Sequence, residues 1–477
     1  MRQDPVNAAP ELKDSEPTHP EPWVLTLILW KLHEIPHVAK RLSWTQTPQS
    51  FQSGGPKYLC FHDQNDTDMP RIKPFKAIRP AQDAAAQVAS VPYDVVNRQE
   101  ATALAEGNPS SFLHVVRPEI DLSPETSAYA DEVYETGRKN LQRLIADGKL
   151  VHDQQESLFA YRQIMNGVAQ TGIVCCCHID DYENNLILKH EKTRKDKEDD
   201  RTRHVLTLNV HSGPVFLTYR DVAKVDAAVA EATAKAPLYD FTAPDGVQHT
   251  VWEIADSAAC VSSLTEVPYF YVADGHHRSA SAWRAGTERR KANPNHTGDE
   301  EYNWFLTVLF PSGQLNILAY NRVIKDLNNQ SADEVLKRLT EVGIIEPTNN
   351  PVPSTAGTFC IYIGNSWYTV TIPQDSINHD DAIESLDVAL LEQRVLGPIL
   401  GIGDVRTDSR IDFVGGIRGT GELEKRVKSG EWACAISMYP TSIEQLMAVS
   451  DAGQIMPPKS TWFEPKLRSG LLVHSLE

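Results

Sequence analysis

The chain of 477 residues is 41% hydrophobic and 23% charged, a composition typical of a globular protein with two or three domains. Acidic side chains outnumber basic ones, 64 to 46, and the net charge of −18 disfavours nucleic acid and anionic membranes as partners, because both require a cationic surface. No apolar run approaches the roughly 18 residues that a membrane-spanning helix needs. Seven cysteines without a paired spacing, and an acidic beginning unlike a signal peptide, predict a cytoplasmic protein.

Residues 1–68 differ in composition from the rest of the chain. They combine the Pro-rich acidic stretch PELKDSEPTHPEP with the polar run TQTPQSFQSGG, and such a segment buries too little apolar surface to offset the entropy of ordering it. The pattern predicts a disordered extension, or a functional start at Met69. The alternative is a short docking segment around Trp23–Trp30.

After Met69 the sequence alternates between helical and strand patterns. Apolar residues at helical spacing predict helices over 126–147, 331–343 and 384–396. Strand-like runs joined by turn residues predict three antiparallel hairpins, which pair 157–164 with 171–179, 303–310 with 315–323, and 358–364 with 366–372. The mixture favours an α+β fold over a regular βαβ array. The interruption DLNNQS predicts two portions, 69–328 and 329–477, with the C-terminal segment returning to the first portion.

The pattern of the cysteines, and the absence of common nucleotide and metal motifs, exclude several classes of functional site. Cys175, Cys176 and Cys177 lie in a strand pattern, so the first and third share a face while the second points away. This alternation favours buried thiols over metal ligands. The chain contains neither GxGxxG nor GxxxxGK[ST], and HEKTR is not the zinc motif HExxH, because Arg194 replaces the second histidine.

The most specific motif is VPYFYVADGHHRSASAWRAG at residues 267–286. An apolar run of strand character ends at Asp274, and a helix is predicted from Ser279 to Ala285, closed by Gly286. A strand that passes through a glycine turn into a helix brings together free backbone N–H groups and the positive end of the helix dipole.

Side chains at this turn add to the predicted anion site. His276, His277 and Arg278 supply donors, and an arginine can bind two phosphate oxygens at once. The pattern predicts a phosphate site from Gly275 to Ser279, with Asp274 placed to hold Mg²⁺ or a substrate hydroxyl. The alternative is a turn with a solvated basic tip.

Three other segments offer polar groups. HEKTRKDKEDDRTRH at 190–204 is either a solvated loop or helix, or a mobile lid that closes over phosphate with Glu191, Thr193, Arg194 and Arg201. The glycines of RIDFVGGIRGTGEL at 410–423 favour a tight turn over a binding loop. The proline-led segment PPKST offers Lys459, Ser460 and Thr461 to an anion.

The string VADGHHRSASA resembles the signature of the ParB/sulfiredoxin-like superfamily and, within it, of the ADP- or ATP-dependent free serine kinases. The span 69–477 resembles domain-of-unknown-function family 1015, through RPAQDAAAQVASVPYDVV, HEKTRKDKEDDR, RIDFVGGIRG and MPPKSTWFEPKLRSGLLVH among other stretches. The resemblance implies a ParB/sulfiredoxin-like nucleotide-binding core with additional antiparallel hairpins and helices. Sulfiredoxin chemistry is excluded, because His276 occupies the place of its nucleophilic cysteine.

When the kinase motif is carried over position by position, it places four residues at the nucleotide phosphates and the substrate: Asp274, His276, His277 and Arg278. The segment PPKST resembles the kinases more weakly. The kinases also use a Glu after a Pro-His pair as the base for the serine proton. The nearest match is Pro92-Tyr93-Asp94, so Asp94 is either that base or the cap of a turn. The implied cofactors are Mg²⁺ and ATP or ADP.

Three functions are compatible with these features. The first is a phosphotransferase, a serine-type kinase that uses a nucleotide to phosphorylate a small hydroxyl substrate. The second is a ParB-like regulatory protein that binds and hydrolyses nucleotide without kinase activity. The third is a binding protein with a vestigial pocket. No helix-turn-helix with a basic surface is recognisable in the sequence, which argues against duplex binding.

Overall fold

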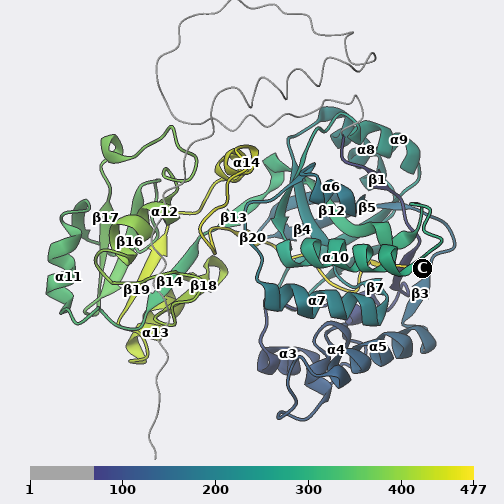
Figure 1. The fold of residues 1–477 in the computed structure, drawn as a ribbon, viewed down its shortest axis with the longest axis horizontal. Helices are drawn as coiled ribbons and strands as arrows, with labels where there is room; N and C mark the ends of the chain where they lie inside the picture. The colour runs from purple at the N-terminus through teal and green to yellow at the C-terminus, as the bar shows by residue number, and fades with distance from the viewer. Residues whose placement is uncertain (1–68) are drawn as a thin grey trace, which may run out of the picture. The chain divides into compact units, whose positions relative to one another are not determined.

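A computed structural model describes residues 69–477 (Figure 1). The predictions for residues 1–68, an extension or a docking segment, lie outside the described residues. The described chain is α+β, as expected, and contains sheets of nine, six, four and two strands. Within residues 69–477, none of the helices combines the length and the apolar character that crossing a membrane requires.

The nine-stranded sheet carries the DGHHR motif at the end of β11. Its order is β6-β11-β8-β12-β5-β4-β10-β9, with β1 paired to β5. The strands are β1 (Ile72–Lys73), β4 (Leu158–Met165), β5 (Val168–His178), β6 (Ile187–Leu188), β8 (Val215–Tyr219), β9 (Tyr239–Thr242), β10 (Gln248–Ile254), β11 (Phe270–Asp274) and β12 (Trp304–Pro311). Most neighbours are antiparallel, but β11 runs parallel to β6, and β12 parallel to β8.

Strand β5 confirms the predicted alternation of the three cysteines. Cys175 and Cys177 belong to one hydrophobic cluster, whereas Cys176 belongs to the cluster on the other side of the sheet. Burial raises the pKa of the Cys176 and Cys177 thiols well above the ordinary value. They are buried core residues, as expected.

Two of the three predicted hairpins are confirmed. β4 and β5 are antiparallel and joined by Asn166 and Gly167, with φ of 52° and 80°, the left-handed backbone that a tight two-residue turn requires. β16 (Thr358–Ile363) and β17 (Ser366–Thr371) pair in the same way through Gly364 and Asn365.

The third predicted hairpin, around the PSGQ turn, is wrong. β12 lies between β8 and β5 instead of pairing with the strand that follows it. β13 (Asn316–Leu318) pairs with β20 (Trp462–Glu464). β14 (Tyr320–Ile324) pairs with β18 (Ile411–Gly415) and β19 (Cys434–Met438). The turn therefore carries the chain from one sheet to the next.

The six-stranded sheet has the order β15-β17-β16-β19-β14-β18. Its remaining strands are β15 (Ile344–Pro347), β18 (Ile411–Gly415) and β19 (Cys434–Met438). The predicted helices are present as α11 (Ala332–Leu339) and as α12 (Asp387–Leu391), which continues into a π-helical turn over Glu392–Leu396. The division proposed at residue 328 stays a prediction; β14 lies before it and already belongs to this sheet.

The end of the chain pairs with early strands. In the four-stranded sheet, β21 (Val473–Ser475) lies between β2 (Ala77–Pro80) and β7 (Val210–His211), and β3 (Leu150–His152) pairs with β2. Eight further α-helices of the described residues are α2 (Ala85–Val88), α3 (Arg98–Ala105), α4 (Leu113–Val116), α6 (Ile179–Glu183), α8 (Ala223–Thr233), α9 (Ser257–Leu264), α13 (Gly419–Lys428) and α14 (Ile443–Asp451).

Three helices form a layer beside the DGHHR motif. α10 (His276–Ala292) packs against α7 (Lys195–Leu208), which packs against α5 (Asp131–Ala146) (Figure 1). The predicted helix end at Gly286 is wrong, because α10 continues to Ala292. Gly286 instead permits close packing: a Cβ there would lie 2.4 Å from the carbonyl oxygen of Tyr302 and 2.5 Å from Ile179 Cδ1.

Candidate functional site

The site is centred on the junction between β11 and α10. Asp274 ends the strand, Gly275 turns the chain with φ of 100°, and His276 begins a helix of 17 residues. Glycine adopts this left-handed backbone without the steric cost of a Cβ. The first N–H groups of the helix have no partner inside it and carry its positive dipole end.

Asp274 is held between two cations. Its Oδ2 lies 2.9 Å from Arg278 Nη2, and its Oδ1 lies 3.4 Å from Lys466 Nζ. The side chains of Arg278 and Lys466 are each only 11% exposed. Burial alone would raise the pKa of Asp274, but the charges of Lys466 and Arg278 hold it well below its usual range. Lys466 was not assigned to the site from the sequence.

Arg278 makes two hydrogen bonds within the protein, one from each Nη. Nη1 donates to the Pro214 carbonyl and Nη2 to Asp274, whereas Nε has no partner among residues 69–477. Its guanidinium also lies 3.8 Å from Asp94. Arg278 therefore fixes the orientation of Asp274 and retains N–H groups, Nε–H among them, that make no hydrogen bond within the described residues.

The two motif histidines have different surroundings. His276 is buried with its ring edge-on to His190, 4.4 Å between ring centroids, and burial lowers its pKa to about 3. His277 Nε2 accepts a 3.1 Å hydrogen bond from the backbone N–H of Arg194, and burial lowers its pKa as well. Ser279 is buried and donates its hydroxyl to the Gly275 carbonyl at 3.2 Å.

The charged segment 190–204 reaches the motif through its first residues. Glu191, Thr193 and Arg194 precede α7, and Arg194 is joined to His277 by the bond just described. Thr193 bonds the Glu198 carboxylate. Arg201 lies within α7, where its Nε donates to Asp200 at 2.8 Å. The mobile lid therefore stays a prediction. Arg201, one of the residues expected in it, lies within the packed helix α7.

Asp94 lies in a turn shortly before α3, and the N-cap of that helix is a different residue. Asn97 caps α3 by accepting a 2.9 Å bond from the Glu100 N–H. The Asp94 carboxylate makes no hydrogen bond within the described residues, is 36% exposed, and faces Arg278. The ring of the preceding Tyr93 lies 4.2 Å below the Arg201 guanidinium.

The C-terminal PPKST segment also lies at the motif. The backbone N–H of Met456 donates to the His190 carbonyl at 2.8 Å. Desolvation would lower the pKa of Lys459, but Tyr320 and the carboxylates of Glu191, Asp94 and Asp274 raise it. Ser460 donates its hydroxyl to Pro457 O at 2.6 Å, and the half-buried Thr461 follows it.

The glycines at 415 and 416 serve packing. A Cβ on Gly415 would lie 2.8 Å from the Trp462 ring, and one on Gly416 would lie 2.6 Å from the Ala319 carbonyl oxygen. Because these two glycines have no side chains, the backbone of the segment packs directly against the Trp462 ring and the Ala319 backbone. This packing is compatible with the predicted tight turn.

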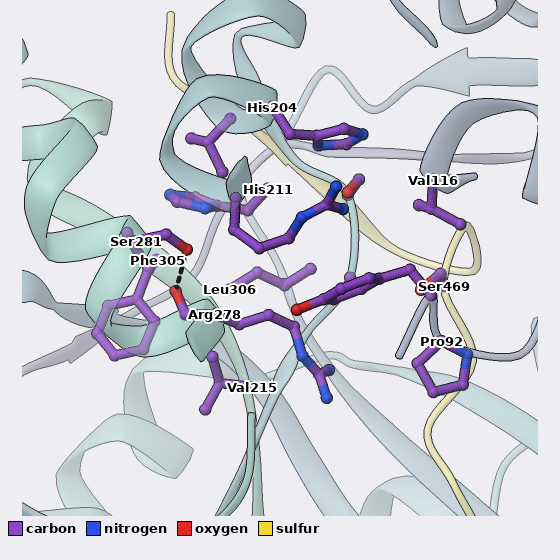
Figure 2. A pocket seen from close by; sticks show the side chains of 16 residues that line it. Pro92, Val116, His204, His211, Val215, Arg278, Ser281, Phe305, Leu306 and Ser469 are labelled. Carbon is purple, nitrogen blue, oxygen red and sulfur yellow. Dashed lines mark hydrogen bonds between the residues drawn. The ribbon is translucent and has the colours of Figure 1, made fainter. Parts of the chain in front are cut away.

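Two pockets adjoin the ion cluster. The first contains Arg278 and Tyr93, and Figure 2 shows Pro92, His204, His211 and Ser469 around it. The second contains Lys466 with Val91, Val95 and Trp462. Among residues 69–477, no group of three or more His, Cys, Asp or Glu side chains is placed to hold a metal ion by itself.

The sequence profile of the family described as "protein of unknown function (DUF1015)" matches residues 72–389. The chain belongs to this family. The expected membership of domain-of-unknown-function family 1015 is thereby confirmed over residues 72–389. This range includes Asp94 and DGHHR and ends before Lys459 and Lys466.

Solved structures give only distant likenesses. A conserved hypothetical protein from Pyrococcus furiosus is 12% identical with a TM-score of 0.31, covering 64% of this chain and 95% of its own. A free serine kinase in complex with AMP is 13% identical with a TM-score of 0.30, covering 63% and 91%. SbnI with a C-terminal truncation, from Staphylococcus aureus, is 13% identical with a TM-score of 0.34, covering 63% and 87%. No curated protein matches the chain.

Proposed function

We propose that this protein is a nucleotide-dependent phosphotransferase that phosphorylates a small hydroxyl compound, on a ParB/sulfiredoxin-like nucleotide-binding core. One observation carries the proposal: beside the N-terminus of α10, Arg278 is shared by Asp274, at 2.9 Å, and by Asp94, at 3.8 Å, and the Asp94 carboxylate makes no hydrogen bond within residues 69–477. Lys466 pairs with Asp274, and the charge of Asp94 acts on Lys459. The cations and the helix dipole suit a phosphate, and the free carboxylate suits a hydroxyl proton. The sequence resemblance of DGHHR to the free serine kinases agrees with this combination.

The transfer uses groups already in place. The acceptor hydroxyl oxygen forms a bond to the terminal phosphorus of ATP or ADP, and the bond from that phosphorus to its bridging oxygen breaks. The bridging oxygen keeps the electron pair and leaves as part of ADP or AMP. The hydroxyl proton passes to the Asp94 carboxylate, while the cations stabilise the charge on the transferred group.

Mg²⁺ fits this site as an ion carried by the nucleotide. Such an ion keeps several waters and takes only one or two protein carboxylates. Both oxygens of Asp274 already face cations, which opposes the Mg²⁺ role expected for it from the sequence. Glu191, whose charge acts on His277 and Lys459 and which has no ion pair within the described residues, is the better ligand. When bound, Mg²⁺ would neutralise phosphate charge.

The decisive experiment measures binding and transfer on Asp94→Asn. The substitution keeps the size of the side chain and removes the proton acceptor. If Asp94 is the base, turnover falls by about 10²–10⁴ while nucleotide affinity changes by no more than a few fold. Calorimetry with ATP and ADP gives the affinity, and phosphorus NMR with Mg²⁺ and a panel of hydroxyl compounds gives the product.

The control is Asp83→Asn, the same change at an exposed turn residue without an ion pair in the described structure. It should leave both quantities unchanged. Full activity of Asp94→Asn would end the assignment of the base. Release of inorganic phosphate without an acceptor product in the wild-type protein would favour the ParB-like hydrolytic alternative.

A further inference from the structure

Both pockets use residues of one loop, 91–95, and each is lined by one of the two cations that bind Asp274. Arg278 lines the first pocket and Lys466 lines the second, and these two residues bind different oxygens of Asp274. Within the loop 91–95, Pro92 and Tyr93 line the first pocket, and Val91 and Val95 line the second. Asp94 lies in the chain between Tyr93 of the first pocket and Val95 of the second, 3.8 Å from Arg278. This placement suits a transfer between an occupant of one pocket and an occupant of the other.

The volumes of the two pockets indicate which part of the reactants each pocket can bind. The space open to water is about 30 Å³ in the first pocket and about 210 Å³ in the second. A bound water needs about 10–15 Å³ on this scale, so the first pocket has room for a group of two or three heavy atoms. The second is the larger by far and has the Trp462 ring and aliphatic side chains for a nucleoside.

The first pocket is cationic and has no carboxylate in its lining. Arg201 uses Nε for Asp200, and its two Nη groups make no hydrogen bond within residues 69–477, although the side chain is only 12% exposed. Burial lowers the pKa of His204 and His211 to about 3, so both rings are neutral at pH 7, and His211 Nε2 also has no described partner. These groups are suited to a small anion, and a carboxylate matches both the charge and the size.

We infer that the first pocket binds the carboxylate of the acceptor, and that the acceptor is a small hydroxy acid without an ammonium group. This inference rests on the proposed function and narrows its substrate class. An α-ammonium group would find no counter-charge here. The pocket lining is free of acids, Asp94 takes the hydroxyl proton, Asp274 is held by two cations, and Glu191 is assigned to Mg²⁺. An unpaired buried charge is costly, so the site discriminates against amino acids.

A matched set of acceptors tests this charge requirement. 3-Hydroxypropanoate has the carboxylate alone, serine adds the ammonium, ethanolamine has the ammonium alone, and 1-propanol has neither. Phosphorus NMR with ATP and Mg²⁺ should give a kcat/KM for 3-hydroxypropanoate at least tenfold above that of each of the others. Comparable or faster phosphorylation of serine would overturn the inference while leaving the phosphotransferase function intact. Equal use of 1-propanol would overturn the role of the carboxylate.

A binding measurement separates this inference from the proposed function. Calorimetry with 3-hydroxypropanoate and a non-hydrolysable ATP analogue should show binding that Arg201→Lys weakens about tenfold to a hundredfold, because lysine keeps the charge but loses the two Nη donors. Lys195→Ala, at an 85% exposed position of the same helix, is the control and should bind as the wild type does. Absence of hydroxy-acid binding to the wild type, or equal binding by Arg201→Lys, would overturn the inference. Binding without any transfer would support this pocket and refute the phosphotransferase function.

Discussion

The ion cluster at Asp274 can be tested through stability, independently of any ligand. Asp274→Asn leaves Arg278 and Lys466, each 11% exposed, without their shared carboxylate. Removing one partner of a fully buried pair costs about 3–5 kcal/mol. Because the Asp274 side chain is 29% exposed and Arg278 retains the Pro214 carbonyl, we expect a smaller loss, about 2–3 kcal/mol, after discounting for solvent screening. Because the unfolding entropy scales with chain length, in a cooperative unit of roughly 400 residues that corresponds to a fall in Tm of about 2–4 °C.

The pH dependence of this loss has a definite sign. The folded-state pKa of Asp274 lies below that of the unfolded chain, where an aspartate titrates near about 4. The ionised carboxylate therefore stabilises the protein above that pH, and the contribution disappears as the pH falls through the folded-state pKa. The difference in stability between wild type and Asp274→Asn should be largest at pH 7 and decrease at acid pH.

Urea unfolding at pH 7 and at progressively lower pH measures both quantities. Asp131→Asn is the matched control, because Asp131 pairs with Arg203 at an 89% exposed position and exposed pairs contribute little. Equal stability of Asp274→Asn and wild type at pH 7 would show that the cluster does not hold Asp274 as described. A loss that is the same at every pH would show that the carboxylate charge is not its cause.

Two further predictions concern packing and buried histidines. Gly286→Ala should cost about 1–3 kcal/mol because its Cβ would meet the Tyr302 carbonyl. Gly421→Ala, at a helical position in α13 with open space around it, should be neutral or slightly stabilising in the same denaturation assay; equal effects would contradict the packing argument. Burial lowers the pKa of His249 and His276 to about 3, against about 6.5 when unfolded. The unfolded chain thus takes up protons first, so urea midpoints should fall as pH decreases from 6.5 toward 3, and a flat profile between pH 6.5 and 4 would refute this.

The local part of the fold could be predicted because short segments determine it. Asn166 and Gly167 tolerate positive φ, and this alone fixes the β4–β5 turn and its register. The same kind of turn signal at PSGQ was misleading, since β12 finds its partners in β5 and β8, far away in sequence. Strand partners across a sheet depend on tertiary packing, which a turn motif does not encode. Gly286 shows the same limit, because its reason is a contact with Tyr302.

The candidate site likewise has a part that the local sequence predicts and a part that depends on tertiary contacts. The turn at Asp274 and Gly275 follows from the local pattern of strand, glycine and helix. Lys466 lies 192 residues beyond Asp274, and nothing in its own segment indicates which carboxylate it meets. The stretch FEPKLRSG, which contains Lys466, resembles family 1015, but the resemblance implies no role for this lysine. Arg201 was expected in a lid, but the charged run gave no sign that one side of its helix lies against Tyr93.

Asp94 shows how the structure weighs two local alternatives. From the sequence, a carboxylate after Pro92-Tyr93 fits a turn cap as well as a base, because both roles need only an acidic side chain near a turn. Capping requires a hydrogen bond to a nearby backbone N–H, and Asn97 makes the one that begins α3. A base requires a free, partly exposed carboxylate beside the groups that bind phosphate, and Asp94 is 36% exposed and 3.8 Å from Arg278. Since a local pattern cannot contain the second set of contacts, the base becomes the stronger hypothesis only when β11, α10 and the loop 91–95 are brought together.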